Sequence, residues 1–194
     1  MDRHWDRRIA GMLLAPLLAP LVTLLAACGM MPSMPSLSVG PFPRTTIPSE
    51  IAPLPTWKLQ MISAATGVQI YRCDPTAGAA GTLEWALQRP EAILRDTVGK
   101  YLGKHYAGPT WEAEDGSKIV GIVEARRDAY GGSIPWLRLS AKSTAGAGLL
   151  GPVTGILRVS TTGGQPPAGG CSEVDRGRII RVDYTADYYF YVKR

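Results

Sequence analysis

Apolar and polar side chains alternate along most of the chain after residue 57, and the alternation is clearest near the C-terminus. One face of residues 182–192 carries Val182, Tyr184, Ala186, Tyr188, Phe190 and Val192, and the other carries Asp183, Thr185, Asp187, Tyr189 and Tyr191. Since successive side chains of a β-strand point to opposite faces, this pattern predicts a strand. We expect it to be central or barrel-closing, with Tyr184, Tyr188 and Phe190 in the core. The other face is expected to be partly solvated or to line a ligand surface.

Shorter segments with the same alternation lie upstream, at residues 68–73, 83–88, 119–125, 137–142 and 157–160. Residues 91–96 fit either a strand or a helical turn. Asp115 and Gly116 tolerate the backbone conformation of a tight turn and predict a hairpin. The 22 Gly and 16 Pro of the chain separate these segments. Together they predict an all-β fold, a single antiparallel β-sandwich or barrel domain over residues 57–194.

The N-terminus has the pattern of a secretory signal. Residues 1–8 form a short, net-positive head, and residues 9–27 are apolar apart from breaks such as Pro16 and Pro20. Such a stretch could also just span a bilayer as a permanent helix. The segment Leu25-Ala26-Ala27-Cys28-Gly29 resembles the lipobox of bacterial lipoproteins, where small residues precede a lipidated Cys. We therefore predict a lipoprotein signal peptide over residues 1–27; the alternative is ordinary cleavage near Ala27.

Lipid on Cys28 would anchor the mature chain to a membrane without a transmembrane helix. We expect an exported protein on the periplasmic face. Gly29, which follows the Cys, favours the outer membrane if the organism has two membranes. Residues 28–56 contain seven prolines and predict an extended tether, whose last part, around Ile51 and Leu54, could lie on the domain.

The chain has three cysteines, an odd number for an exported protein. Lipidation accounts for Cys28. The remaining two, Cys73 and Cys171, would most simply pair as a structural disulfide in an oxidising compartment. They are too far apart in sequence for a redox-active Cys-x-x-Cys motif.

One short segment combines polar, aromatic and turn residues of the kind that build a site. It supplies our candidate ligand-binding residues His105, Tyr106, Trp111 and Glu112. His105 is the only His after signal removal, so a His-rich metal site is excluded, and we expect neither a metal nor a cofactor.

Residues 146–151 match the dinucleotide pattern G-x-G-x-x-G, but Pro152 and a strand-like run follow where a helix is required. A Gly-rich loop between strands is the better interpretation.

The net charge of the chain does not point to a particular partner. Removing residues 1–27 takes away three Arg and two Asp, and lowers the net charge from +5 to +4. Small clusters such as Arg126-Arg127 could contact nucleic acid, but export argues against that partner.

Two function classes stay open. The first is a non-enzymatic envelope module that binds a glycan, a small apolar ligand or an envelope partner. The aromatic candidates for this binding are Tyr106, Trp111, Trp136, Tyr189 and Tyr191. The alternative is a hydrolase or isomerase that uses His105 with a nearby carboxylate, Glu112 or Asp115.

Several motifs in order resemble the domain-of-unknown-function 3455 family of exported bacterial and fungal proteins. They are residues 67–73 (GVQIYRC), 105–112 with 115–117, 134–137 (IPWL), 161–164 (TTGG) with 170–171, and 184–191 (YTADYYFY). The likeness covers about residues 57–191. Leu157 departs from it, since the family has Gln before the Arg. The resemblance implies export, a single domain and paired cysteines, and it brings no established activity.

Overall fold

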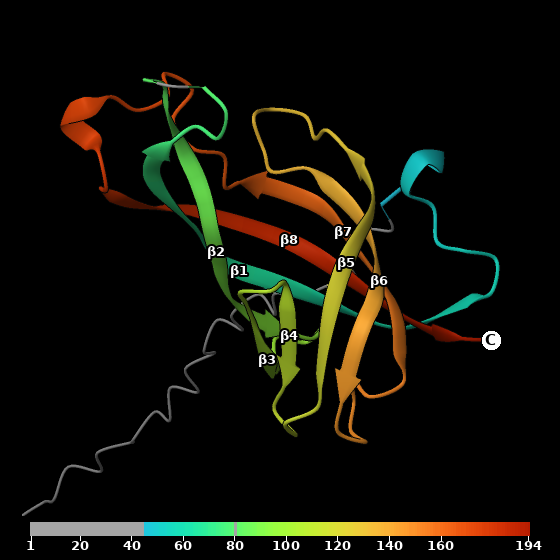
Figure 1. Cartoon of the computed structure of the whole chain (residues 1–194). Helices are drawn as coiled ribbons and strands as arrows, with labels where there is room; N and C mark the ends of the chain where they lie inside the picture. Colours follow the sequence, from blue (N-terminus) through green and yellow to red (C-terminus); the bar gives the residue numbers. More distant parts are fainter. Residues whose placement is uncertain (1–44, 80) are drawn as a thin grey trace, which may run out of the picture. The chain divides into compact units, whose positions relative to one another are not determined.

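A computed structural model describes residues 45–79 and 81–194 of the chain (Figure 1). The strands are β1 (Trp57–Pro75), β2 (Leu83–Arg95), β3 (Tyr101–Tyr106), β4 (Thr110–Ala113), β5 (Lys118–Arg127), β6 (Trp136–Ala145), β7 (Val153–Gly163) and β8 (Ile179–Lys193). Two short 3-10 helices, η1 (Ser49–Ile51) and η2 (Glu173–Asp175), lie before β1 and before β8. The described residues include no helix with the length and apolar character needed to cross a membrane.

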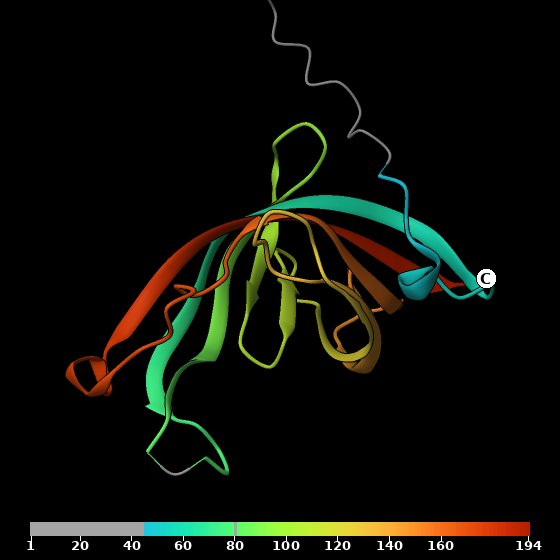
Figure 2. The same ribbon diagram turned by 90° about the horizontal axis from the view of Figure 1, so that it is seen from above.

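The eight strands form one closed antiparallel barrel in sequence order. Each strand pairs with the next along the chain, and β8 pairs with both β7 and β1 (Figures 1 and 2). The predicted all-β class is confirmed, and of the two architectures expected the barrel is the one observed. The prediction that the C-terminal strand closes the barrel is confirmed as well. Residues 91–96, which fitted two structures, continue β2 as far as Arg95.

The barrel has two unlike ends. We call the end with the β1–β2, β3–β4, β5–β6 and β7–β8 connections the mouth, and the opposite end the base. At the base the Asp115 carboxylate accepts hydrogen bonds from the backbone N–H of Ser117 (2.9 Å) and of Leu149 (2.7 Å), which ties the β4–β5 turn to the β6–β7 loop. Leu150 from that loop is buried in the core. The loop contains residues 146–151, so the Gly-rich segment connects two strands, as expected.

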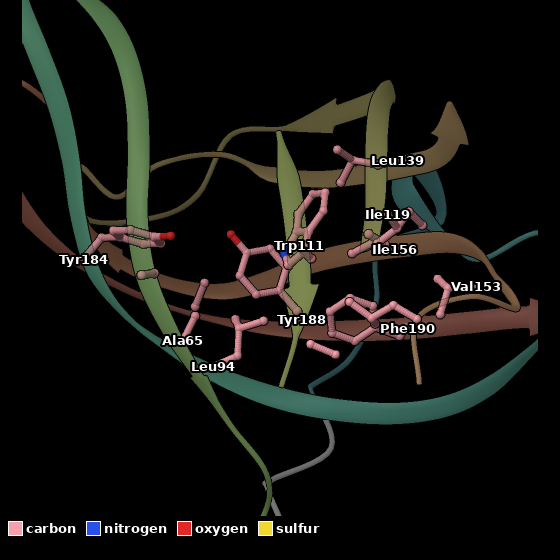
Figure 3. Close-up of a cluster of buried hydrophobic side chains, with 14 of the residues drawn as sticks. Ala65, Leu94, Trp111, Ile119, Leu139, Val153, Ile156, Tyr184, Tyr188 and Phe190 are labelled. Atoms are coloured by element: carbon pink, nitrogen blue, oxygen red, sulfur yellow. The ribbon is translucent and has the colours of Figure 1, made fainter. Parts of the chain in front are cut away.

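Aromatic side chains fill the barrel interior (Figure 3). Trp111 packs edge-to-face against Tyr188, with ring centroids 5.3 Å apart, and against Phe190 at 6.5 Å. Tyr184 is buried nearer the mouth on the same face of β8. The prediction that Tyr184, Tyr188 and Phe190 lie in the core is therefore confirmed.

A second apolar cluster lies on the outside of the barrel. Tyr189 and Tyr191 of β8 are each only 6% exposed, because Ile51 and its neighbours cover this face together with Trp57 and Leu157. The expectation that these two tyrosines are solvated or line a ligand surface is wrong. The Trp57 ring lies so close to Gly155 that a Cβ there would overlap it. The last part of the Pro-rich segment is thus folded onto the barrel. The predicted signal peptide and Cys28 lie outside the described residues.

Candidate site: a cavity at the mouth of the barrel

A cavity of about 600 Å³ opens at the mouth. Its position follows from unequal strand lengths, because β3 and β4 have six and four residues whereas β1 and β2 have 19 and 13. The long strands form one wall, β5 and β6 form the other, and the short β3–β4 hairpin leaves the gap between them. The apolar lining consists of Trp85, Leu87, Pro90, Pro109, Val123, Ile134, Pro135, Leu137 and Pro166.

Arg158 is the cation of the cavity interior. It lies on β7 directly opposite Leu137 of β6 and Tyr188 of β8, which places it on the inner face. Its guanidinium donates from Nε (3.0 Å) and Nη2 (2.8 Å) to the Pro135 carbonyl oxygen. Within the described part of the chain no carboxylate oxygen lies within 4 Å of it, so its charge has no ion-pair partner.

His105 is buried beside this arginine. Its Nδ1 lies 2.9 Å from the Thr110 carbonyl oxygen. Since a carbonyl can only accept, Nδ1 carries the proton and Nε2 is left as an acceptor. The pKa of His105 is lowered to about 3: burial is the largest cause, the Thr110 hydrogen bond opposes it, and the nearby positive charge of Arg158 acts in the same direction as burial. The imidazole is therefore neutral at physiological pH.

Three further polar side chains surround Arg158 and His105. The hydroxyls of Tyr184 and Tyr188 face one another (Figure 3), yet neither reaches a hydrogen-bond partner among the described residues. Burial raises the pKa of both hydroxyls, and the charge of Arg158 acts in the opposite direction on each. Gln69, only 2% exposed, lines the cavity from β1. The interior at this end is polar and positively charged, whereas the walls above it are apolar.

The four predicted ligand-binding residues divide between the two faces of the sheet. His105 and Trp111 are direct cross-strand partners inside the barrel, where their rings stack with centroids 4.3 Å apart. Tyr106 and Glu112 lie on the outer surface, and the Tyr106 hydroxyl donates to the Glu112 carboxylate at 2.6 Å. Of the four, only His105 lines the mouth cavity.

Glu112 belongs to an exposed charge cluster. Its oxygens lie 3.1 Å from Lys118 Nζ and 3.5 Å from Lys104 Nζ. The Tyr106 hydrogen bond, followed by that of Lys118, lowers the pKa of Glu112. Asp115 is at the base of the barrel. Neither carboxylate is placed as the acid–base partner of His105, and the described residues contain no group of three metal-ligating side chains.

Sequence reasoning missed Arg158, Gln69 and Tyr71, which line the cavity from β7 and β1. The signal for Arg158 was present, because it interrupts the otherwise apolar run Ile156 to Val159. A charged residue at one position of such a run is exposed, paired or functional.

A disulfide between Cys73 and Cys171 holds one edge of the mouth. The Cα atoms lie 6.1 Å apart and the predicted pairing is confirmed. In the same region the Tyr71 hydroxyl donates to the Gly164 carbonyl at 2.6 Å and Trp85 Nε1 donates to the Gly170 carbonyl at 2.8 Å. These three links fasten the β7–β8 connection to β1 and β2 beside the cavity.

The fold and the cavity define a small closed antiparallel barrel with a pocket in one end. The chain belongs to the DUF3455 family of proteins of unknown function, which it matches over residues 53–192. The resemblance seen in the sequence motifs is thereby confirmed. Comparison with curated proteins and with solved structures gives no match.

Proposed function

We propose that this chain is an exported, lipid-anchored binding protein that holds a small, largely apolar molecule in the mouth cavity. The observation that carries the proposal is the cavity itself, about 600 Å³ with predominantly apolar walls. Pockets for small molecules have this size and this mixture of apolar walls with a few polar groups. Leu87 and Val123 line it with side chains about half exposed, and a bound molecule would cover them.

The glycan alternative receives less support. Trp111, Tyr189 and Tyr191, three of the five aromatic candidates, are buried and offer no face for a sugar to stack on. Tyr106 engages Glu112 on the outer surface, away from the mouth cavity. The enzymatic alternative lacks a carboxylate beside His105, as described above.

Binding can be tested with the neutral fluorescent probe N-phenyl-1-naphthylamine, using two variants of adjacent residues. Val123 and Ile122 are equally exposed at 49%, but only Val123 lines the cavity. Val123→Trp should fill the mouth and weaken probe binding at least tenfold. Ile122→Trp, which adds the same side chain to the outer face of β5, should bind as the wild type does. Absence of saturable binding to the wild type, or equal loss in both variants, would overturn the proposal.

The anchoring part rests on residues 1–29. Small residues before Cys28 support cleavage at that position and lipidation of its thiol, and Gly29 supports transfer to the outer membrane. Because the thiol accepts the lipid, Cys28→Ser should leave an unprocessed precursor. Mass spectrometry of the N-terminal peptide from membrane-purified wild type should find a modified Cys28, and an unmodified one would refute this part.

A further inference from the structure

We propose that the molecule held in the mouth cavity is an amphipathic monoanion, a carboxylate on an apolar body, whose head group binds to Arg158. This inference rests on the proposed binding function and adds the chemical class of the ligand.

The charge of the cavity lining is the first argument. The lining contains three arginines, Arg89, Arg126 and Arg158, and no aspartate or glutamate. Arg89 is paired with Glu91 at 2.8 Å and Arg126 with Asp128 at 3.3 Å. Arg158, the innermost of the three, has no such partner. A ligand in the cavity would cover the partly buried Arg158, and burying a charge without an opposite charge is unfavourable. An anion bound here would therefore gain more than a neutral molecule of the same shape.

Hydrogen-bonding capacity is the second argument. The guanidinium has five N–H donors, and Pro135 engages only Nε and Nη2. The Gln69 amide, which also carries N–H donors, lines the same cavity and is only 2% exposed. A partly buried guanidinium and a buried amide thus face a space large enough for a ligand. Carboxylates are the acceptors that guanidinium and amide groups bind well.

The neighbours of Arg158 set the charge of the ligand. His105 stays neutral, and the phenols of Tyr184 and Tyr188 stay protonated, because burial disfavours their charged forms. The interior therefore contributes a single positive charge from Arg158, which matches one carboxylate. The apolar walls formed by Leu87, Val123 and Leu137 would take the remainder of the molecule.

The test compares three ligands with the same ten-carbon chain: decanoate, 1-decanol and decylammonium. Each displaces N-phenyl-1-naphthylamine from the wild type at concentrations below micelle formation. We expect decanoate to bind at least tenfold more tightly than decanol, and decylammonium to bind most weakly. Equal affinities for decanoate and decanol would overturn the monoanion proposal while leaving apolar binding intact. If the probe itself does not bind, the proposed function fails instead.

Two variants then locate the head group. Arg158→Met keeps an unbranched chain in place of the arginine stem and removes the charged guanidinium, so decanoate should lose its advantage over decanol while the probe still binds. Arg127→Met removes an arginine that does not line the cavity and that already pairs with Glu50 at 2.8 Å, and the advantage should change less than twofold. An advantage that survives in Arg158→Met refutes the assignment to this residue. Circular dichroism confirms folding, and if Arg158→Met does not fold, the same comparison of decanoate with decanol is made with Arg158→Gln, which also removes the charge.

Discussion

His105 and Trp111 stack inside the barrel, with ring centroids 4.3 Å apart and ring planes inclined by only 15°. Tyr188 packs edge-on against both rings, with interplanar angles of 61° to His105 and 75° to Trp111 and centroids 5.3 Å away. A charged imidazolium in this position would have lost its water and would lie close to Arg158. The stack therefore requires a neutral His105, and stability must depend on pH.

The first prediction concerns this dependence. The pKa of His105 is about 3 in the folded chain and about 6.5 when unfolded, so below pH 6.5 only the unfolded state takes up the proton. Its contribution to stability is complete above pH 6.5 and falls as pH drops towards 3, by roughly 1.4 kcal/mol per pH unit. Urea unfolding of wild type and His105→Gln at pH 7 and 4.5 should show the stability difference shrinking by about 2 to 3 kcal/mol. Carboxylates titrate in both proteins, so their effect cancels in the difference between the two unfolding free energies. If wild type and His105→Gln lose the same stability between pH 7 and 4.5, the low pKa of His105 is contradicted.

A second prediction concerns the link between β1 and the β7–β8 connection. The disulfide joins residues separated by 98 positions and restricts the unfolded chain by up to roughly 4 to 5 kcal/mol in the entropic description. Cys73→Ala and Cys171→Ala should each cost a few kcal/mol, and the double variant should cost no more than the larger single effect, because all three lose the same bond. Denaturant midpoints of the four proteins check this. Additive losses would show that each cysteine contributes separately.

A third prediction concerns the Pro-rich segment before β1. Ile51 is fully buried against the outer face of the barrel, whereas Leu54, three residues later, is 43% exposed. Ile51→Ala should destabilise the domain by about 2 to 4 kcal/mol, as expected for a core aliphatic residue, and Leu54→Ala by about 1 kcal/mol or less. Thermal unfolding of both variants provides the comparison. Equal small effects would mean that this segment does not pack against the barrel in solution.

Much of the strand arrangement could be predicted, because the alternation of apolar and polar residues indicates which side chains of a strand face the core. The 182–192 pattern identified the closing strand and three of its buried aromatics. It could not show that Tyr189 and Tyr191 are covered, since the covering residue Ile51 lies far away in a segment without periodicity. Proline limits regular structure there to the short η1 helix, but it does not prevent packing.

The candidate site was only partly predictable for a related reason. His105 and Tyr106 are adjacent in sequence, and in a strand adjacent side chains point to opposite faces. Proximity in sequence therefore grouped residues that the sheet separates. Arg158 and Gln69 come together with His105 only through closure of the barrel, and the opening above them depends on the relative lengths of strands. Barrel closure and the relative lengths of the strands cannot be seen in a local sequence pattern.

The last prediction tests the inner face of β8. Phe190 has no exposed surface and packs near Trp111 and Tyr188, whereas Thr185 lies on the outer face of the same strand and is exposed. Truncating a core aromatic removes its buried area and leaves a cavity, so Phe190→Ala should cost about 3 to 5 kcal/mol. Thr185→Ala removes only a modest strand preference and should cost about 1 kcal/mol or less. Urea unfolding measures both, and the slope of free energy against urea should match the wild type, so that a shifted midpoint reports stability alone. A Phe190→Ala midpoint equal to that of the wild type at the same slope would mean that this face of β8 does not form the core.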